Sequence, residues 1–370
     1  MNRKKFLYVL AGSVVIPTVT YVAFSDLSNL GRADLKPDAT LNRNLIPDER
    51  KILYLASLAP SGHNTQPWMI KYLEPFHWII CNDKSKWLPA VDPTQRETML
   101  SIGAFIQNLE YAAANLGYNC RFSLLGNTNQ DEKIMEIQLS PAGRTVGYEV
   151  RNIIQRRTVR SNILSDPLKT DHIKLLIDNE SDSIHFIPRT TKNYQYLNQQ
   201  TIEANKVQSY RNTAQKELAD WIRFANKDAE KHCDGLTPAS MEIEGFSGWV
   251  VRNFYGRSNV MSKSFRDQNI GLAEKQVASS AGWLLITSKD ASVTSLIETG
   301  KRMQRLFLKV RSKGIAIHPM TQILEEPVIH QGLNASIGLT EPVQFILRTG
   351  YVKDYPEPVS LRRPVDWLIY

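Results

Sequence analysis

A short polar segment between a predicted helix and a predicted strand contains the first residues that could hold a ligand. It reads Ala59-Pro-Ser-Gly-His-Asn-Thr-Gln-Pro-Trp68, so two prolines and a glycine, which are typical of turns, stand among several side chains that can form hydrogen bonds. Such a turn presents backbone N–H groups and short polar side chains at fixed positions, which suits the polar edge of a cofactor. A well-capped connection between a helix and a strand would explain the same residues, so this segment alone leaves both interpretations open.

Two arginine clusters are candidates for binding an anion. The first reads Gln155-Arg-Arg-Thr-Val-Arg-Ser-Asn162, where guanidinium groups stand beside hydroxyl groups. That combination suits a phosphate monoester dianion. The second cluster reads Leu361-Arg-Arg-Pro-Val365 and lies near the C-terminus. Alternatively, the first cluster forms an ordinary basic face exposed to solvent, and the second consists of surface arginines without a ligand.

Other classes of site have little support in the sequence. The 7 histidines show no HExxH spacing and the 3 cysteines form no CxxC pair, so we expect neither a metal site nor a disulfide framework. No GxGxxG or GxxxxGK[ST] motif is present, which excludes the usual Rossmann and P-loop phosphate turns. The net charge is +8, but the basic residues are spread along the whole chain, so we expect no nucleic-acid partner.

The elements that position these residues predict an α+β chain. A length of 370 residues with 42% hydrophobic and 22% charged residues is typical of a globular protein with two domains or one large unit. Pro and Asp in a first turn predict a helix over 46–59, and periodic apolar residues predict helices over 101–117 and 300–313. Residues 191–231 contain a long polar-amphipathic helical stretch. Strands are predicted over 78–81, 121–125, 134–139, 184–187, 283–287 and 343–351. Their irregular alternation favours a sandwich over a doubly wound sheet, with a coarse duplication into 46–142 and 143–370.

The N-terminus has the features of a targeting segment. Residues 1–24 begin with Arg3, Lys4 and Lys5, and no charged residue follows until Asp26. The uncharged run approaches the length needed to cross the ~30 Å hydrocarbon core of a membrane. We therefore expect a signal peptide or a retained membrane anchor, and the sequence leaves cleavage open. Residues 25–45 are then a linker to the globular part.

In this order, the segments resemble the nitroreductase family of flavin proteins, in which RRSxR and PSxxNxQPW motifs line FMN. The likeness covers about residues 46–368 and is close to the Acg-type branch, whose members look like two fused nitroreductase halves. It includes Leu88–Glu97, Gly314–Met320 and the final RRPV. The resemblance implies a nitroreductase-like three-layer sandwich, with the fused halves forming an intramolecular pseudo-dimer. It also implies one complete FMN site between the halves, formed within one chain.

The resemblance assigns roles to residues by their position. It implies that Arg156, Thr158 and Arg362 or Arg363 bind the phosphate of FMN, and that Arg160 lies near N1 and O2 of the flavin ring. A cation there stabilises the negative charge of the reduced flavin. The predicted cofactor-binding residues are Pro60, Ser61, Gly62, Asn64, Gln66, Arg156, Arg157, Thr158, Arg160, Met320, Thr321, Arg362 and Arg363. Met320 and Thr321 match a loop whose backbone N–H faces flavin N5. We expect no catalytic side chain, because N5 itself receives the hydride.

The function expected from this resemblance is transfer of a hydride from NAD(P)H through FMN to a small-molecule acceptor. Two alternatives remain, namely a protein that sequesters or stores FMN and an anchored scaffold without flavin. Residues 234–259 are long and rich in aromatic residues and glycine, as a lid could be, although an ordinary insertion would look similar. Because Arg3-Lys-Lys-Phe-Leu7 nearly matches the twin-arginine signal, we expect export by that route, to the periplasm or to the inner membrane as an anchored protein.

Overall fold

The computed structural model describes residues 28–32, 45–143, 147–177 and 180–370. The predicted targeting segment 1–24 and most of the predicted linker 25–45 lie outside these residues. Within the described ranges, no helix is both long and apolar enough to cross a membrane.

Two antiparallel sheets of four strands form the outer layers of the sandwich. The first contains β1 (Trp68–Glu74), β2 (His77–Asn82), β3 (Tyr118–Leu124) and β4 (Lys133–Pro141), in the order β1-β2-β4-β3. The second contains β5 (Ile184–Pro188), β6 (Gly282–Thr287), β7 (Ile315–Pro319) and β8 (Val343–Tyr351), in the order β5-β6-β8-β7. Both sheets therefore place their strands in the same order: first, second, fourth and third.

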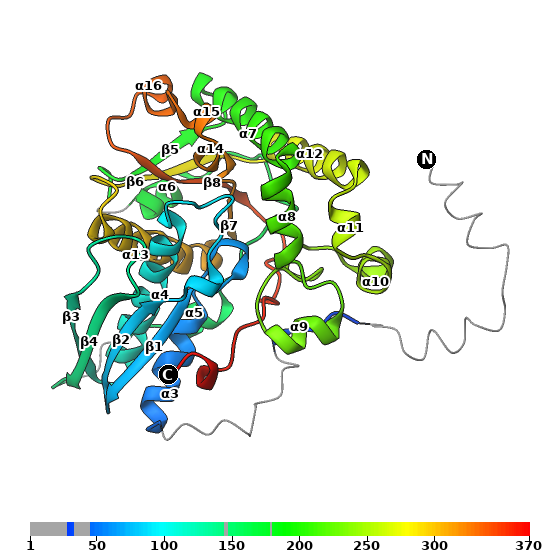
Figure 1. Cartoon of the computed structure of the whole chain (residues 1–370). Helices are drawn as coiled ribbons and strands as arrows, with labels where there is room; N and C mark the ends of the chain where they lie inside the picture. Colours follow the sequence, from blue (N-terminus) through cyan, green and yellow to red (C-terminus); the bar gives the residue numbers. More distant parts are fainter. Residues whose placement is uncertain (1–27, 33–44, 144–146, 178–179) are drawn as a thin grey trace, which may run out of the picture.

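The long helices α4 (Arg96–Asn115) and α13 (Val293–Val310) form the layer between the two sheets (Figure 1). Each connects the second and third strands of its own sheet, so the chain contains the same arrangement of strands and helix twice. One hydrophobic core runs through both halves, from Trp68 and Phe105 to Leu284 and Phe307. The predicted α+β class and the two fused halves are thus confirmed, whereas the exact boundary between 142 and 143 stays a prediction.

The helices α4 and α13 cross at a pair of glycines. A Cβ atom on Gly103 would lie 2.2 Å from the carbonyl oxygen of Ile297, and one on Gly300 would lie 2.0 Å from that of Leu100. Gly103 follows Leu100 by three residues, as Gly300 follows Ile297, so the two contacts are related by an approximate twofold axis. Only glycine allows two helix backbones to approach this closely.

The remaining helices surround these layers. They are α3 (Pro47–Ser57), α5 (Val150–Gln155), α6 (Thr170–Ile177), α7 (Lys192–Tyr210), α8 (Asn212–Trp221), α9 (Asn226–His232), α10 (Gly245–Phe254), α11 (Arg257–Val260), α12 (Lys263–Ala278), α14 (Gln322–Glu325), α15 (Pro327–His330) and α16 (Leu333–Ile337). The predicted helical stretch over 191–231 is divided into α7, α8 and α9, because Arg211 and Ile222 adopt extended backbone conformations. Helices α7 to α12 form a lobe at one side of the layers (Figure 1).

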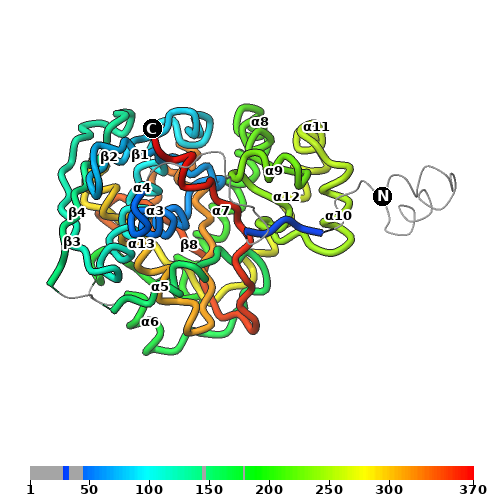
Figure 2. The backbone as a smooth tube through the Cα atoms, turned by 90° about the horizontal axis from the view of Figure 1, so that it is seen from below, coloured from blue at the N-terminus to red at the C-terminus, as the bar shows by residue number. Residues whose placement is uncertain are grey.

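The C-terminal segment returns from the second sheet to the first. The backbone N–H of Ile70 in β1 donates to the carbonyl of Leu368 (2.7 Å), and Tyr370 N–H donates to the carbonyl of Ile70 (3.1 Å). Figure 2 shows this segment in red beside the first sheet. It carries the Arg362-Arg363 pair past the end of α3, so the structure brings together sequence segments separated by about 300 positions.

Candidate functional site

A cavity of about 550 Å³ lies where the two halves meet the lobe of α7 to α12. Its size is within the range of small-molecule and cofactor sites. Seven predicted site residues line it: Pro60, Ser61, Gly62, Thr158, Arg160, Met320 and Thr321. Apolar side chains from the central helices, including Leu100, Met303 and Phe307, complete the wall. The structure does not bring Asn64, Gln66, Arg156, Arg157, Arg362 or Arg363 to this wall.

The segment that follows α3 is held in a tight, unusual conformation. A 3₁₀ turn spans Gly62–Asn64, and positive φ angles occur at His63 (47°), Asn64 (55°) and Gln66 (56°). Left-handed conformations are costly for residues other than glycine and cluster at functional sites. Ser61 Oγ accepts the backbone N–H of Gln66 at 2.9 Å, which fixes the turn. The turn therefore presents Pro60, Ser61 and Gly62 to the cavity with little freedom.

Asn64 and Gln66 are buried on the other side of this turn. Asn64 Nδ2 donates to the carbonyls of Gly235 (3.0 Å) and Leu361 (3.2 Å). Gln66 Oε1 accepts the backbone N–H of Arg363 at 2.9 Å. In this structure both side chains attach the turn to the C-terminal segment and do not face the ligand space.

Arg156 lies directly behind the cavity wall. Its guanidinium stands 5.3 Å above the ring of Phe307, and its Nη1 is 3.5 Å from Thr158 Oγ1. Burial, followed by the neighbouring charge of Arg32, lowers the pKa of Arg156 to about 10. The Nε atom is buried without a hydrogen-bond partner. An unsatisfied, buried guanidinium next to a hydroxyl group suits the phosphate of a ligand.

Arg362 is buried close to Arg156 but is more fully bonded. Its Nη2 donates to the carbonyls of Leu58 (3.2 Å) and Ala59 (3.0 Å), and its Nη1 donates to Asn64 Oδ1 (2.7 Å). Its Nε has no partner. Burial, followed by the charges of Arg32 and Arg156, lowers the pKa of Arg362 well below its usual range. Among the residues that the structure describes, neither Arg156 nor Arg362 forms an ion pair with a carboxylate.

Arg157 and Arg363, by contrast, have acidic partners. Arg157 Nη2 lies 3.6 Å from a carboxylate oxygen of Glu242, and Arg363 Nη1 lies 3.5 Å from one of Asp83. Arg363 also donates to the carbonyl of Gln66 at 2.6 Å. Because their charges are already compensated, these two arginines are weaker candidates for holding an anion than Arg156 and Arg362.

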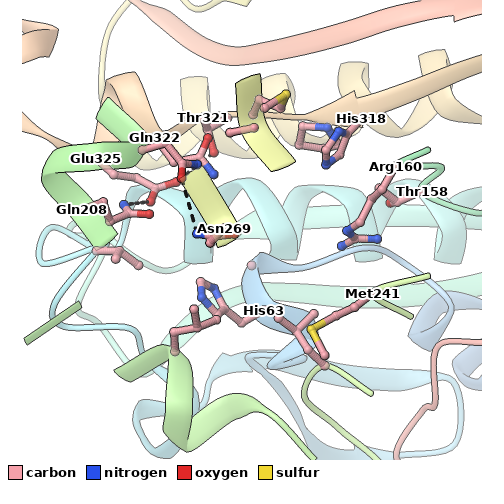
Figure 3. Close-up of a pocket in the computed structure, with 18 of the residues that line it drawn as sticks. His63, Thr158, Arg160, Gln208, Met241, Asn269, His318, Thr321, Gln322 and Glu325 are labelled. Atoms are coloured by element: carbon pink, nitrogen blue, oxygen red, sulfur yellow. Dashed lines mark hydrogen bonds between the residues drawn. The ribbon is translucent and has the colours of Figure 1, made fainter. Parts of the chain in front are cut away.

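Arg160 places a cation in the cavity wall between two histidines. Its Nη1 donates to the carbonyl of Ser240 (2.9 Å), which fixes the side chain. Burial and the charge of Arg160 lower the pKa of His63 to about 4. Burial, followed by Arg348 and Arg160, lowers the pKa of His318 well below its usual value, and its Nδ1 has no partner. This end of the cavity therefore combines one cation with two neutral imidazoles (Figure 3).

A pair of carboxyl groups that sequence reasoning missed lies in another part of the cavity wall. Thr321 Oγ1 donates to Glu325 Oε1 (2.9 Å) and lies 3.4 Å from Glu97 Oε1, so its hydroxyl stands between the two acids. Gln208 Nε2 donates to Glu325 Oε2 at 2.6 Å (Figure 3). Burial and the nearby charge of Glu97 raise the pKa of Glu325 to about 8. Glu97 ends the matched segment Leu88–Glu97, but no sequence signal marks Glu325.

The loop predicted to contact flavin N5 is only partly available. The backbone N–H of Met320 donates to the carbonyl of Ile346 at 2.9 Å, so it is engaged in the fold. The Met320 side chain and Thr321 still line the cavity. Thr321 is therefore the stronger candidate for a contact with the reactive edge of a bound ring.

The predicted lid segment covers one side of the cavity. Leu236, Met241 and Ile243 line the wall just before α10. Glu242, between them, accepts the backbone N–H groups of Arg160 (2.9 Å) and Ser161 (2.7 Å). The position fits a cover over the ligand, and its opening stays a prediction.

These features together fit FMN as a ligand. The cavity volume, the apolar wall, the unsatisfied guanidinium atoms behind that wall and the cation at Arg160 match a flat ring system with a phosphate tail.

Comparison with known proteins supports the resemblance. No protein-family model matches the chain. It is 25% identical over 340 residues to a Mycobacterium tuberculosis H37Rv protein that carries the name of an NAD(P)H nitroreductase, acg, covering 89% of this chain and 96% of that protein. It is 24% identical over 326 residues to PigM of Serratia, also named for an NAD(P)H nitroreductase, covering 83% and 89%. A nitroreductase-like protein of known structure from Bacillus cereus matches with a TM-score of 0.32 and 13% identity, and the match covers 60% of this chain and 95% of that one. A similarity this low supports no further argument.

Proposed function

We propose that this chain, an oxidoreductase of the nitroreductase family, binds FMN in the cavity between its halves and passes a hydride from NAD(P)H to a small-molecule acceptor. The observation that carries the proposal is the pair of buried arginines, Arg156 and Arg362, next to a cavity of cofactor size. Neither has a carboxylate partner among the described residues, and both have an unsatisfied Nε. A bound phosphate would satisfy these groups.

FMN, when bound, supplies the hydride-accepting atom, and the residues of this chain supply position and electrostatics. Arg156 and Thr158 would hold the phosphate. Arg160 would favour negative charge on the nearby ring edge, because its guanidinium is fixed in the cavity wall. Pro60, Ser61 and Gly62 would border the ring and its side chain from the first half. The apolar wall would exclude water from the reacting face.

The decisive experiment is the spectrum of the purified protein under anaerobic conditions. Flavin absorbance at stoichiometric occupancy, and its bleaching by NADH or NADPH, would support the oxidoreductase. A colourless protein that takes up no added FMN would contradict the proposal. Flavin that is bound but not reduced, while dithionite does reduce it, would favour sequestration of FMN. One observation favours this second function, the sequestration of FMN. Glu242 accepts hydrogen bonds from the backbone of Arg160 and Ser161, and these contacts hold the covering segment over the cavity.

We also propose that the flavin site is formed within one chain. Residues from both halves line the same cavity, which supports this proposal. Size-exclusion chromatography with light scattering should find the flavin in a monomer. Flavin that appears only in a dimer would contradict this organisation.

The sequence of residues 1–24 leads to a further proposal, that the protein is exported and held at the membrane. Residues 1–35 fused to a reporter that fluoresces only when exported folded would test it. A soluble reporter in the cytoplasm would contradict both export and anchoring.

A further inference from the structure

A third arginine joins Arg156 and Arg362 from the N-terminal segment 28–32. Arg32 Nε donates to the carbonyl of Ser360 (3.1 Å), and its Nη1 lies 3.4 Å from the carbonyl of Ile154. Ser360 precedes Arg362 by two residues, and Ile154 precedes Arg156 by two residues. Arg32 therefore bridges the two segments that carry the predicted phosphate-binding arginines. Figure 2 shows its segment in blue beside the red C-terminal segment.

The three guanidinium groups are close enough for the charge of one to change the pKa of another. Arg156 and Arg362 are only 6% and 5% exposed. Burial lowers the pKa of Arg32, and the charge of Arg32 in turn lowers the pKa of both other arginines. In the described part of the chain, no carboxylate forms an ion pair with any of the three. Burying several like charges together without a counter-ion is unfavourable. An anion with more than one negative charge would compensate the three guanidinium groups.

The cluster lies against the cavity wall. Arg156 contacts Phe307 and Thr158, which both line the cavity. Arg362 donates to the carbonyl of Ala59, the residue before the cavity-lining Pro60. An anion held by the cluster is therefore placed to be the phosphate end of a ligand whose remainder fills the cavity.

We propose that Arg32 is a third phosphate-binding residue and that segment 28–32 closes the phosphate end of the FMN site. This inference rests on the proposed function. The segment is also attached elsewhere, because Asn226 Nδ2 donates to the carbonyl of Ser28 (2.8 Å) and Arg252 donates to Asn29 Oδ1. Docking of the segment brings Arg32 to the phosphate, and the phosphate in turn stabilises the docked segment. Thermodynamic linkage makes this coupling reciprocal.

Comparing FMN with riboflavin tests the role of Arg32, because the two ligands differ only by the phosphate. We expect Arg32→Ala to weaken FMN binding roughly ten- to hundredfold, as expected for a lost charge-assisted contact, and to leave riboflavin binding unchanged. Arg189→Ala is the matched control. Arg189 also donates to two backbone carbonyls, of Ala278 (2.9 Å) and Ser280 (3.2 Å), but these carbonyls belong to neither the segment of Arg156 nor that of Arg362. It should change neither affinity.

The outcomes of the comparison between FMN and riboflavin distinguish the role of Arg32 from the proposed function. Equal losses for FMN and riboflavin would show that Arg32 is only structural, and unchanged FMN affinity would remove it from the site. A wild-type protein that binds neither flavin would instead refute the proposed function.

Limited proteolysis of the wild-type protein provides a second measurement, which does not depend on a variant that folds. FMN should slow cleavage by trypsin after Arg32, whereas riboflavin at the same occupancy should not. Equal protection by both flavins, or by neither, would overturn the coupling.

Discussion

Replacement of Gly300 by alanine should separate the two central helices. The new Cβ atom would lie 2.0 Å from the backbone oxygen of Leu100, whereas Cβ contacts in proteins stay above 3.0 Å. The obstacle is backbone, so no side-chain rotation relieves it and α4 and α13 must move apart by about 1 Å. Overpacking of this kind costs about 1–3 kcal/mol, and the higher helix propensity of alanine returns at most about 1 kcal/mol. After the full return, the free energy of unfolding should fall by up to about 2 kcal/mol.

Gly271→Ala in α12 is the matched control for this change. Gly271 is also a helical glycine, but a Cβ there would meet no atom within 4 Å. Alanine should stabilise the protein at this position by about 0.5–1 kcal/mol. Urea denaturation followed by circular dichroism compares the variants directly. A Gly300→Ala protein as stable as Gly271→Ala would refute the argument that the crossing requires glycine. Because Leu100 also lines the cavity, the flavin affinity of Gly300→Ala should fall as well.

The remaining predictions concern the cavity. Arg156→Ala should weaken FMN binding by about 1.5–3 kcal/mol, and full flavin occupancy after dialysis would contradict its role at the phosphate. Arg160→Ala should keep the flavin bound but lower its midpoint potential, so an unchanged potential in a redox titration would exclude Arg160 from the ring edge. Glu325 has a folded pKa of about 8, above its ordinary value of 4.5, so folding favours its protonated form. Its contribution to stability is complete below pH 4.5 and is lost as the pH rises through 8, with a slope of at most about 1.4 kcal/mol per pH unit. Glu325→Gln, which imitates the protonated acid, should reduce this loss between pH 6 and 9, and urea titrations with identical slopes for both proteins would contradict it.

Local sequence patterns predicted much of the fold. The apolar stripes predicted α4 and α13, although both helices begin several residues earlier than expected, at Arg96 and Val293. An apolar stripe identifies the buried face of a helix, but it does not locate the first turn, because polar residues are also common there. Strands β1 and β7 did not stand out, because β1 alternates only weakly and β7 is short.

The candidate site was harder to predict than the elements. Residue type identified the polar turn, and the structure places Ser61 in the cavity wall but Asn64 behind it. Adjacent residues of similar polarity face opposite sides of a tight turn, and only the three-dimensional path decides which side each takes. Arg32 and Glu325 carry no motif at all. They reach the site because distant segments pack together, and no local signal records such packing.

The twofold crossing of α4 and α13 has an evolutionary consequence. In a dimer of identical chains, a substitution at such an axis appears twice and must be tolerated at both positions. Here Gln107 and Gln304, each four residues after its glycine, are the same residue. Asn108 and Arg305, each five residues after it, differ, so the interhelical hydrogen bonds from Gln304 to Asn108 (2.7 Å) and from Arg305 to Gln107 (2.9 Å) are not alike. A single chain with two halves can change one side of its axis at a time, so one half is free to specialise while the other preserves the shared frame.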